Sequence, residues 1–194
     1  MSSESSSTQT YRIPGEPGIW VFLLGDMVIF TVCFGAFLVA RAEDRELFSS
    51  SRHTLGLTIG LTNTVVLLVS SMLVVLGLGA IRVDARRVAA RMFAAAAACG
   101  LLFAVLKIVE YSHLIGAGHG PEANSYYNYF FILTGMHLFH LLVGVAVLAA
   151  LTAHARREVE FTGTRRVVFE AGACFWHLVD LLWMMLFPLL YLVG

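Results

Sequence analysis

Charged residues are scarce in this sequence. Aspartate, glutamate, lysine and arginine make up 13% of the 194 residues, whereas apolar residues make up 58%. Soluble domains usually carry about 25% charged residues, so this composition argues against a soluble domain. The formal net charge is zero, which gives no bulk attraction for nucleic acid or for an acidic partner.

Cysteine is also rare, and no two cysteines have the C-x-x-C spacing of a metal or redox site. Cys33, Cys99 and Cys174 each lie inside an apolar stretch, which is typical of small buried side chains rather than of disulfides or metal ligands. The first ten residues lack both a basic start and an apolar run. They do not resemble a cleaved signal peptide, and we expect residues 1–17 to form a flexible tail and turn.

Long apolar stretches dominate the rest of the chain. A helix needs about 20 residues to cross the hydrocarbon core of a bilayer. The stretches that meet this length are 18–41, 57–81, 91–115, 126–152 and 168–193. We therefore expect an all-α polytopic membrane protein in which residues 18–194 form a single five-helix bundle. Short connections predict antiparallel neighbours, and residues 42–55 are expected to form a charged, serine-rich external loop.

Arginine is distributed unevenly between the two ends of the predicted spans. Nine arginines lie at one end and three at the other, where acidic residues dilute them. The richer end contains Arg12, Arg82, Arg86, Arg87, Arg91, Arg156, Arg157, Arg165 and Arg166. Basic loops favour the cytoplasm, which predicts a cytoplasmic N-terminus and an outside C-terminus. The membrane is expected to be a bacterial-type plasma membrane.

Ionisable side chains interrupt four of the five predicted spans. They are Asp26, Lys107, Glu110, His137, His140, Glu170, His177 and Asp180. Because charge inside a bilayer is costly, such groups normally face a protein interior and find partners there. Pairs spaced three residues apart share a helix face. At a rise of about 1.5 Å per residue, we expect five of them to meet near mid-membrane, namely Lys107, His137, His140, His177 and Asp180.

Asp26 differs from the others because its own helix offers no counter-ion. It is expected nearer the cytoplasmic end of its span, surrounded by phenylalanines. Burial disfavours a charged carboxylate, so Asp26 is the candidate for an exchangeable proton.

The residues alone leave several roles open for this polar set. Ion pairs and hydrogen bonds that fix the helices against each other are the simplest. A haem held between His140 and His177 is an alternative, and a proton relay in a standalone proton-coupled transporter is another. Di-iron bundles use a Glu-x-x-His motif on each of two helices. This sequence has a single such stretch, Glu110 to His113, so the paired motif is absent, which argues against that kind of metal site.

Several motifs resemble those of subunit III of haem–copper oxidases. The last span is similar to the final helix of that family, with its E-x-x-x-x-x-W-H-F-V-D-x-x-W pattern, through Glu170, Trp176, His177, Val179, Asp180 and Trp183. The T-G-x-H-x-x-H motif is matched by Thr134, Gly135, His137 and His140. Shorter matches are Asn63, Thr64 and Ser70, then Glu110 with Tyr111, and Asp26 stands where the family usually has glutamate. The resemblance covers about residues 18–194.

This resemblance implies an accessory subunit without catalytic, cofactor or metal residues of its own. Haem and copper are expected in a catalytic partner subunit, whose proton uptake the chain would support, and a structural phospholipid is expected as a ligand. Longer family members have seven helices, so this chain resembles their five-helix part. The Gly25-Asp26-Met27 context and the run from Lys107 to Tyr111 resemble the branch associated with nitric-oxide reductases, which leaves such a reductase as an alternative partner.

Overall fold

The computed structural model describes residues 17–52, 54–156 and 163–193, and every element in these ranges is helical. The long helices are α1 (Pro17–Glu43), α3 (Leu57–Arg82), α4 (Arg86–Gly116), α5 (Ser125–Arg156) and α6 (Gly163–Phe187). Five helical segments are long and apolar enough to cross a membrane, which confirms the predicted all-α five-span bundle. The predicted flexible tail lies outside the described residues, except for Pro17 at the start of α1.

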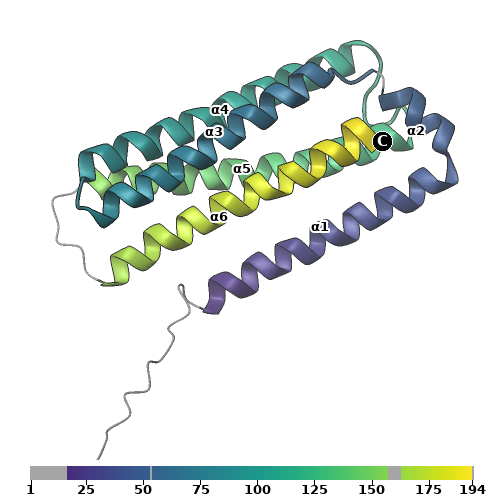
Figure 1. Cartoon of the computed structure of the whole chain (residues 1–194). Coiled ribbons are helices and arrows are strands. Elements are labelled where there is room, and N and C mark those ends of the chain that lie inside the picture. The colour runs from purple at the N-terminus through teal and green to yellow at the C-terminus, as the bar shows by residue number, and fades with distance from the viewer. Residues whose placement is uncertain (1–16, 53, 157–162, 194) are drawn as a thin grey trace, which may run out of the picture.

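Four of the long helices form a closed core, and α1 packs on its side. Helix α3 contacts α4, α4 contacts α5, α5 contacts α6, and α6 returns to contact α3. Helix α1 packs on α5 and α6, and Figure 1 shows it running alongside α6. One face of α1 is buried, through Leu23, Asp26, Phe30 and Phe37. Its other faces carry exposed apolar side chains, as a membrane-facing helix requires.

The prediction that residues 42–55 form a loop is wrong, because a short helix, α2 (Arg45–Arg52), occupies most of this segment. The Asp44 carboxylate accepts a hydrogen bond from the Leu47 backbone N–H at 3.1 Å, which caps the first turn. Phe48 is 1% exposed and meets Phe37 and Tyr126 at ring-centroid distances of 5.4 and 5.5 Å. The charged, serine-rich composition of this segment therefore predicted a loop, whereas the segment forms an amphipathic helix that covers one end of the bundle.

The last span ends in a different helix type from the one expected. Helix α6 gives way at Pro188 to a π-helical turn, η1 (Pro188–Val193). Proline has no backbone N–H to donate to an α-helical ladder, and π-helical turns are often found at functional positions. The turn places Tyr191, which is 6% exposed, inside the bundle. The fourth helix, α4, also begins at Arg86 rather than at residue 91.

Candidate functional site

Lys107, in the middle of α4, is fully buried and neutralised inside the bundle. Its side chain is 0% exposed. The Nζ atom donates to Glu110 Oε2 at 2.8 Å and to the Tyr191 hydroxyl at 2.8 Å. The Tyr191 hydroxyl in turn donates to Glu110 Oε1 at 2.6 Å. Lys107, Glu110 and Tyr191, here called the lysine cluster, form a closed triangle that joins α4 to η1.

Aromatic rings complete the surroundings of the Lys107 ammonium. Its Nζ atom lies 4.8 Å from the centre of the Phe130 ring and 4.9 Å from that of Trp183. The ring of Tyr191 lies at 5.2 Å and that of Tyr111 at 5.8 Å. Ring faces attract cations within about 6 Å. Rings and one carboxylate therefore replace the water that would otherwise solvate this charge.

Asp26 finds its partner on another helix. His140 Nε2 lies 3.2 Å from Asp26 Oδ1 and 3.2 Å from Oδ2. The contact joins α1 to α5, and Asp26 is 8% exposed. The counter-ion that the sequence of α1 lacks is thus supplied by α5.

The contact of the other ring nitrogen of His140 determines which of the two nitrogens carries a proton. His140 Nδ1 lies 2.8 Å from the Met136 carbonyl oxygen, and a carbonyl only accepts hydrogen bonds, so Nδ1 carries a proton. A hydrogen bond between Nε2 and the Asp26 side chain then needs one further proton, either on Nε2 or on the carboxyl group. The Asp26–His140 contact therefore links α1 to α5 through two groups that can each carry a proton.

A third polar group joins α3 to α6. Ser71 Oγ lies 2.7 Å from His177 Nδ1, and Asp180 lies three residues further along the same helix. His177 is half-buried and Asp180 is 8% exposed. The spacing of His177 and Asp180 predicted that they share a helix face, but the sequence did not indicate that Ser71 is the partner of His177.

His137 belongs to none of these groups. It is 0% exposed, and neither ring nitrogen has a hydrogen-bond partner among the described residues. The centroid of its ring lies 5.4 Å from that of the Trp183 ring and 5.6 Å from that of the Phe103 ring. Asn63 is likewise 0% exposed. Its side-chain amide has no hydrogen-bond partner among the described residues.

In the described part of the chain, the residues expected to meet near mid-membrane form separate hydrogen-bonded groups, except for His137. Lys107 lies in the lysine cluster, His140 contacts Asp26, and His177 contacts Ser71. His137 packs between the rings of Phe103 and Trp183. Glu170 lies nearer the surface, 4.0 Å from Arg82. The histidines proposed as haem ligands, His140 and His177, each bond other side chains.

The remaining motif residues tie neighbouring helices together. Trp183 Nε1 donates to Thr64 Oγ1 at 3.0 Å, which joins α6 to α3. The hydroxyls of Tyr111 and Thr134 lie 2.6 Å apart, which joins α4 to α5. Ser70 donates to the Ala96 carbonyl at 2.9 Å. These hydrogen bonds fix the register of four helices in an environment without competing water.

Trp176 is the largest packing element of the motif and depends on two glycines. A Cβ atom on Gly100 of α4 would lie 2.7 Å from the Trp176 ring, and one on Gly144 of α5 would lie 2.8 Å from it. The indole therefore fills the space that two missing side chains leave between α4 and α5. Gly135 differs, because a Cβ there would meet nothing within 4 Å.

Sequence reasoning missed Tyr191 as a polar partner, because it lies in an apolar end of the last span. The available signal was that Tyr191 carries the one hydroxyl group in residues 184–194. Within the described ranges, no three His, Cys, Asp or Glu side chains come together in an arrangement that would hold a metal ion.

Five membrane-length helices, with one buried ion pair inside α4 and another contact of ionisable side chains between α1 and α5, define an integral membrane bundle. Comparison of sequences gives the family. The model of the family described as cytochrome c oxidase subunit III matches residues 5–194. The chain belongs to the cytochrome c oxidase subunit III family, as its motifs predicted.

Individual relatives resemble this chain over most of its length. Cytochrome c oxidase subunit 3 of Synechocystis sp. is 29% identical over 205 residues, which cover 100% of this chain and 85% of the relative. The protein of the same name in Thermostichus vulcanus is 28% identical over 176 residues, covering 91% and 86%. Cytochrome bo(3) ubiquinol oxidase subunit 3 of Pseudomonas aeruginosa is 29% identical over 179 residues, covering 91% and 84%.

Proposed function

We propose that this chain is the accessory subunit III of a haem–copper terminal oxidase in a respiratory electron-transport chain. The observation that carries the proposal is the match of the subunit III family to residues 5–194. Relatives named as subunits of cytochrome c oxidase and of ubiquinol oxidase support it equally. Because these names specify different electron donors, the proposal extends to the haem–copper oxidase class and leaves the donor open.

The role of the chain within such a complex would be structural and supporting, with haem and copper bound by the catalytic partner. The paired ionisable groups would hold five helices in register, and the apolar outer faces would contact lipid and the partner subunit. The arginine distribution supports a cytoplasmic N-terminus and an outside C-terminus. A bacterial-type plasma membrane is the location that fits this orientation.

We further propose that the Asp26–His140 pair exchanges a proton near the cytoplasmic side. Asp26 lies nine residues after Pro17, the first residue of α1, which is about 14 Å along the helix. Infrared titration of the purified chain tests this. The wild type should show a carboxyl band that responds to pH and disappears in Asp26→Asn, whereas an unchanged band in the variant would contradict the proposal.

Co-purification tests the main proposal. A tagged chain expressed in its own host should carry a haem-bearing subunit with it from a mild detergent, and the complex should reduce oxygen. A tagged membrane protein of similar size and different family is the control for nonspecific recovery. Recovery of the chain alone from membranes that contain active oxidase would contradict the proposal.

A nitric-oxide reductase remains a second candidate partner, supported by the sequence around Asp26 and by the Lys107–Tyr111 run. The same purified complex separates the two, since an oxidase consumes oxygen and a reductase consumes nitric oxide. A standalone proton-coupled transporter predicts instead that the chain alone moves protons in liposomes.

A further inference from the structure

Two cavities at one end of the bundle reach the partners of Lys107. One has a volume of about 380 Å³, lies between the start of α3 and the end of α4, and includes Glu110 in its lining. The other has a volume of about 340 Å³, lies beside η1, and includes Tyr191. Lys107 lines neither of them. The lysine cluster is therefore approached from this end through its carboxyl and phenol groups.

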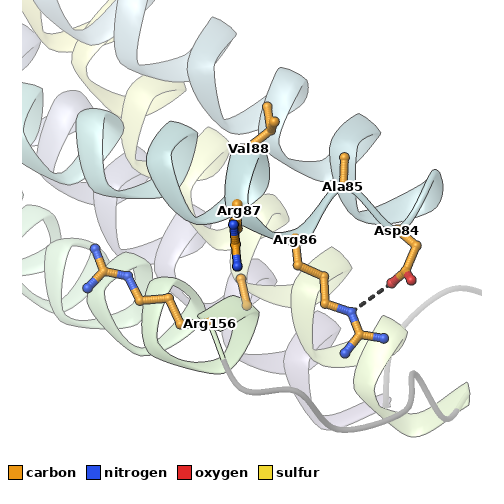
Figure 2. A pocket seen from close by; sticks show the side chains of 7 residues that line it. Asp84, Ala85, Arg86, Arg87, Val88 and Arg156 are labelled. Atoms are coloured by element: carbon orange, nitrogen blue, oxygen red, sulfur yellow. Dashed lines mark hydrogen bonds and ion pairs between the residues drawn. The ribbon is translucent and has the colours of Figure 1, made fainter.

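The cavity at the opposite end of α4 does not reach the cluster. It is drawn in Figure 2, lies where α4 begins, and is lined by none of the three residues of the lysine cluster. Its Arg86 donates to Asp84 at 2.7 Å, the contact dashed in Figure 2. Arg86 begins α4, and Lys107 follows about six turns later, about 32 Å along the helix. Water can therefore approach the lysine cluster from the end of α4 rather than from its start.

The cavity that reaches Glu110, here called the glutamate cavity, opens where α4 leaves the membrane. Ala117, one of its lining residues, follows Gly116, the last residue of the membrane-length segment of α4. Glu110 precedes that end by less than two turns, about 9 Å along the helix, and its side chain is 3% exposed. The accessible part of this side chain therefore lies within reach of water that enters the cavity. The residues of the glutamate cavity used below are Thr54, Glu110, His113, Ala117 and His119.

Polar groups along the glutamate cavity are suited to hold water on the way to Glu110. The Thr54 hydroxyl lies 2.7 Å from the Tyr127 hydroxyl, and the His119 ring stacks on the Tyr127 ring at a centroid distance of 5.0 Å. Tyr127 thus holds two lining residues in place. The imidazoles of His113 and His119 can each accept and donate a hydrogen bond, and confined water needs about two to four such partners.

The cavity beside η1 is less suited to carry protons. A guanidinium group only donates hydrogen bonds and keeps its positive charge, so Arg52, which lines this cavity, neither accepts a proton nor attracts one. The Tyr191 hydroxyl already donates its proton to Glu110 at 2.6 Å. The other residues of this lining are leucines. Of the two cavities, the glutamate cavity has the groups that a proton path requires.

We propose that the glutamate cavity is an aqueous inlet through which the buried lysine cluster exchanges protons with the water at this end of the bundle. Lys107 Nζ passes a proton to Glu110 Oε2, 2.8 Å away, so an N–H bond breaks and an O–H bond forms. The carboxyl group gives that proton to a water molecule in the cavity, takes another from it, and returns it to Nζ. The charges of the ion pair are the same before and after the exchange. This property goes beyond the supporting role proposed above and holds for any catalytic partner.

Nuclear magnetic resonance of the full chain in nanodiscs tests the inlet. Lys107 is the one lysine of the chain, so lysine labelled with a heavy nitrogen isotope gives a single side-chain ammonium signal. Its loss after transfer to heavy water measures the exchange rate. The test variant Ala117→Trp obstructs the glutamate cavity, and the matched control Ala123→Trp places the same side chain on an exposed residue outside that lining. Leu192→Trp obstructs the cavity beside η1 instead.

The ammonium signal of the wild type should decay, and Ala117→Trp should slow the decay about tenfold, which corresponds to about 1.4 kcal/mol of added barrier. Ala123→Trp and Leu192→Trp should exchange like the wild type, and an unchanged ammonium chemical shift shows that the cluster is intact in each variant. A wild-type signal that persists as long as the backbone amides of the core would overturn the proposal, as would equal rates in Ala117→Trp and Ala123→Trp. Slower exchange in Leu192→Trp alone would place the path in the other cavity and overturn it too.

Discussion

Replacing Lys107 with methionine should destabilise the bundle, and replacing Glu110 as well should restore most of the loss. Methionine keeps the length of the side chain but removes two hydrogen bonds of 2.8 Å, to Glu110 and to Tyr191. It leaves the Glu110 carboxylate, which is 3% exposed, without its cation.

The magnitude follows from the burial of the pair. Removing one partner of a buried ion pair costs about 3–5 kcal/mol, whereas replacing both with apolar groups of similar volume is close to neutral. Lys107→Met should therefore lower the free energy of unfolding by about 3–5 kcal/mol. Lys107→Met with Glu110→Met should remain within about 1 kcal/mol of the wild type, so the two substitutions are strongly non-additive.

Unfolding by a denaturing detergent, followed by tryptophan fluorescence, measures this cycle. Trp183 reports directly, because its ring lies 4.9 Å from the Lys107 ammonium. The single substitutions and the double substitution are compared under one detergent composition. A Lys107→Met variant as stable as the wild type, or a double variant as unstable as the sum of the two single variants, would refute the reasoning.

Three further predictions follow from burial and packing. Lys107 is the one lysine of the chain, so an amine-reactive ester should leave the buried Lys107 of the folded protein unlabelled and react only at the N-terminal amine. In the variant Arg45→Lys, the ester should also label the new lysine at this exposed position. Mass spectrometry of the peptides shows which sites react, and labelling of native Lys107 would contradict its burial. Gly144→Ala should lower the free energy of unfolding by about 1–3 kcal/mol, because the new methyl group would crowd the Trp176 ring. Gly135→Ala has open space around it and should leave the free energy of unfolding unchanged. Equal effects of the two substitutions in detergent unfolding would show that Trp176 does not pack closely against Gly144. Thr64→Val should cost about 1 kcal/mol by removing the acceptor of a buried indole N–H, and a variant as stable as the wild type in the same assay would show that this hydrogen bond contributes nothing.

The sequence was sufficient to predict the helices because membrane spans have a strong local signal. Each span is a stretch of about 20 or more mostly apolar residues, so the composition of the stretch is enough to predict a membrane helix. The short helix α2 has no such run, and its one large buried side chain, Phe48, stood among charged residues and serines. Its burial depends on Phe37 and Tyr126, which come from helices far away in the chain.

The sequence predicted the pairing of Lys107 with Glu110 on one helix, but it did not predict the partners that come from other helices. Spacing along one helix predicts a pair such as Lys107 and Glu110, because residues three apart share a face. It does not give the rotation of one helix against another, which decides that Asp26 meets His140. Tyr191 enters the lysine cluster through a π-helical turn, and no local pattern specifies where such a turn directs its side chains.

Optical spectra, recorded for the isolated chain and for the complex that it forms, test the central claim most directly. The account places all redox centres in the partner, so the reduced-minus-oxidised spectrum of the complex should show haem bands. The isolated chain, purified in the same detergent, should show none. A haem band retained by the isolated chain would contradict the account, as would a chain that never recovers a haem-bearing partner.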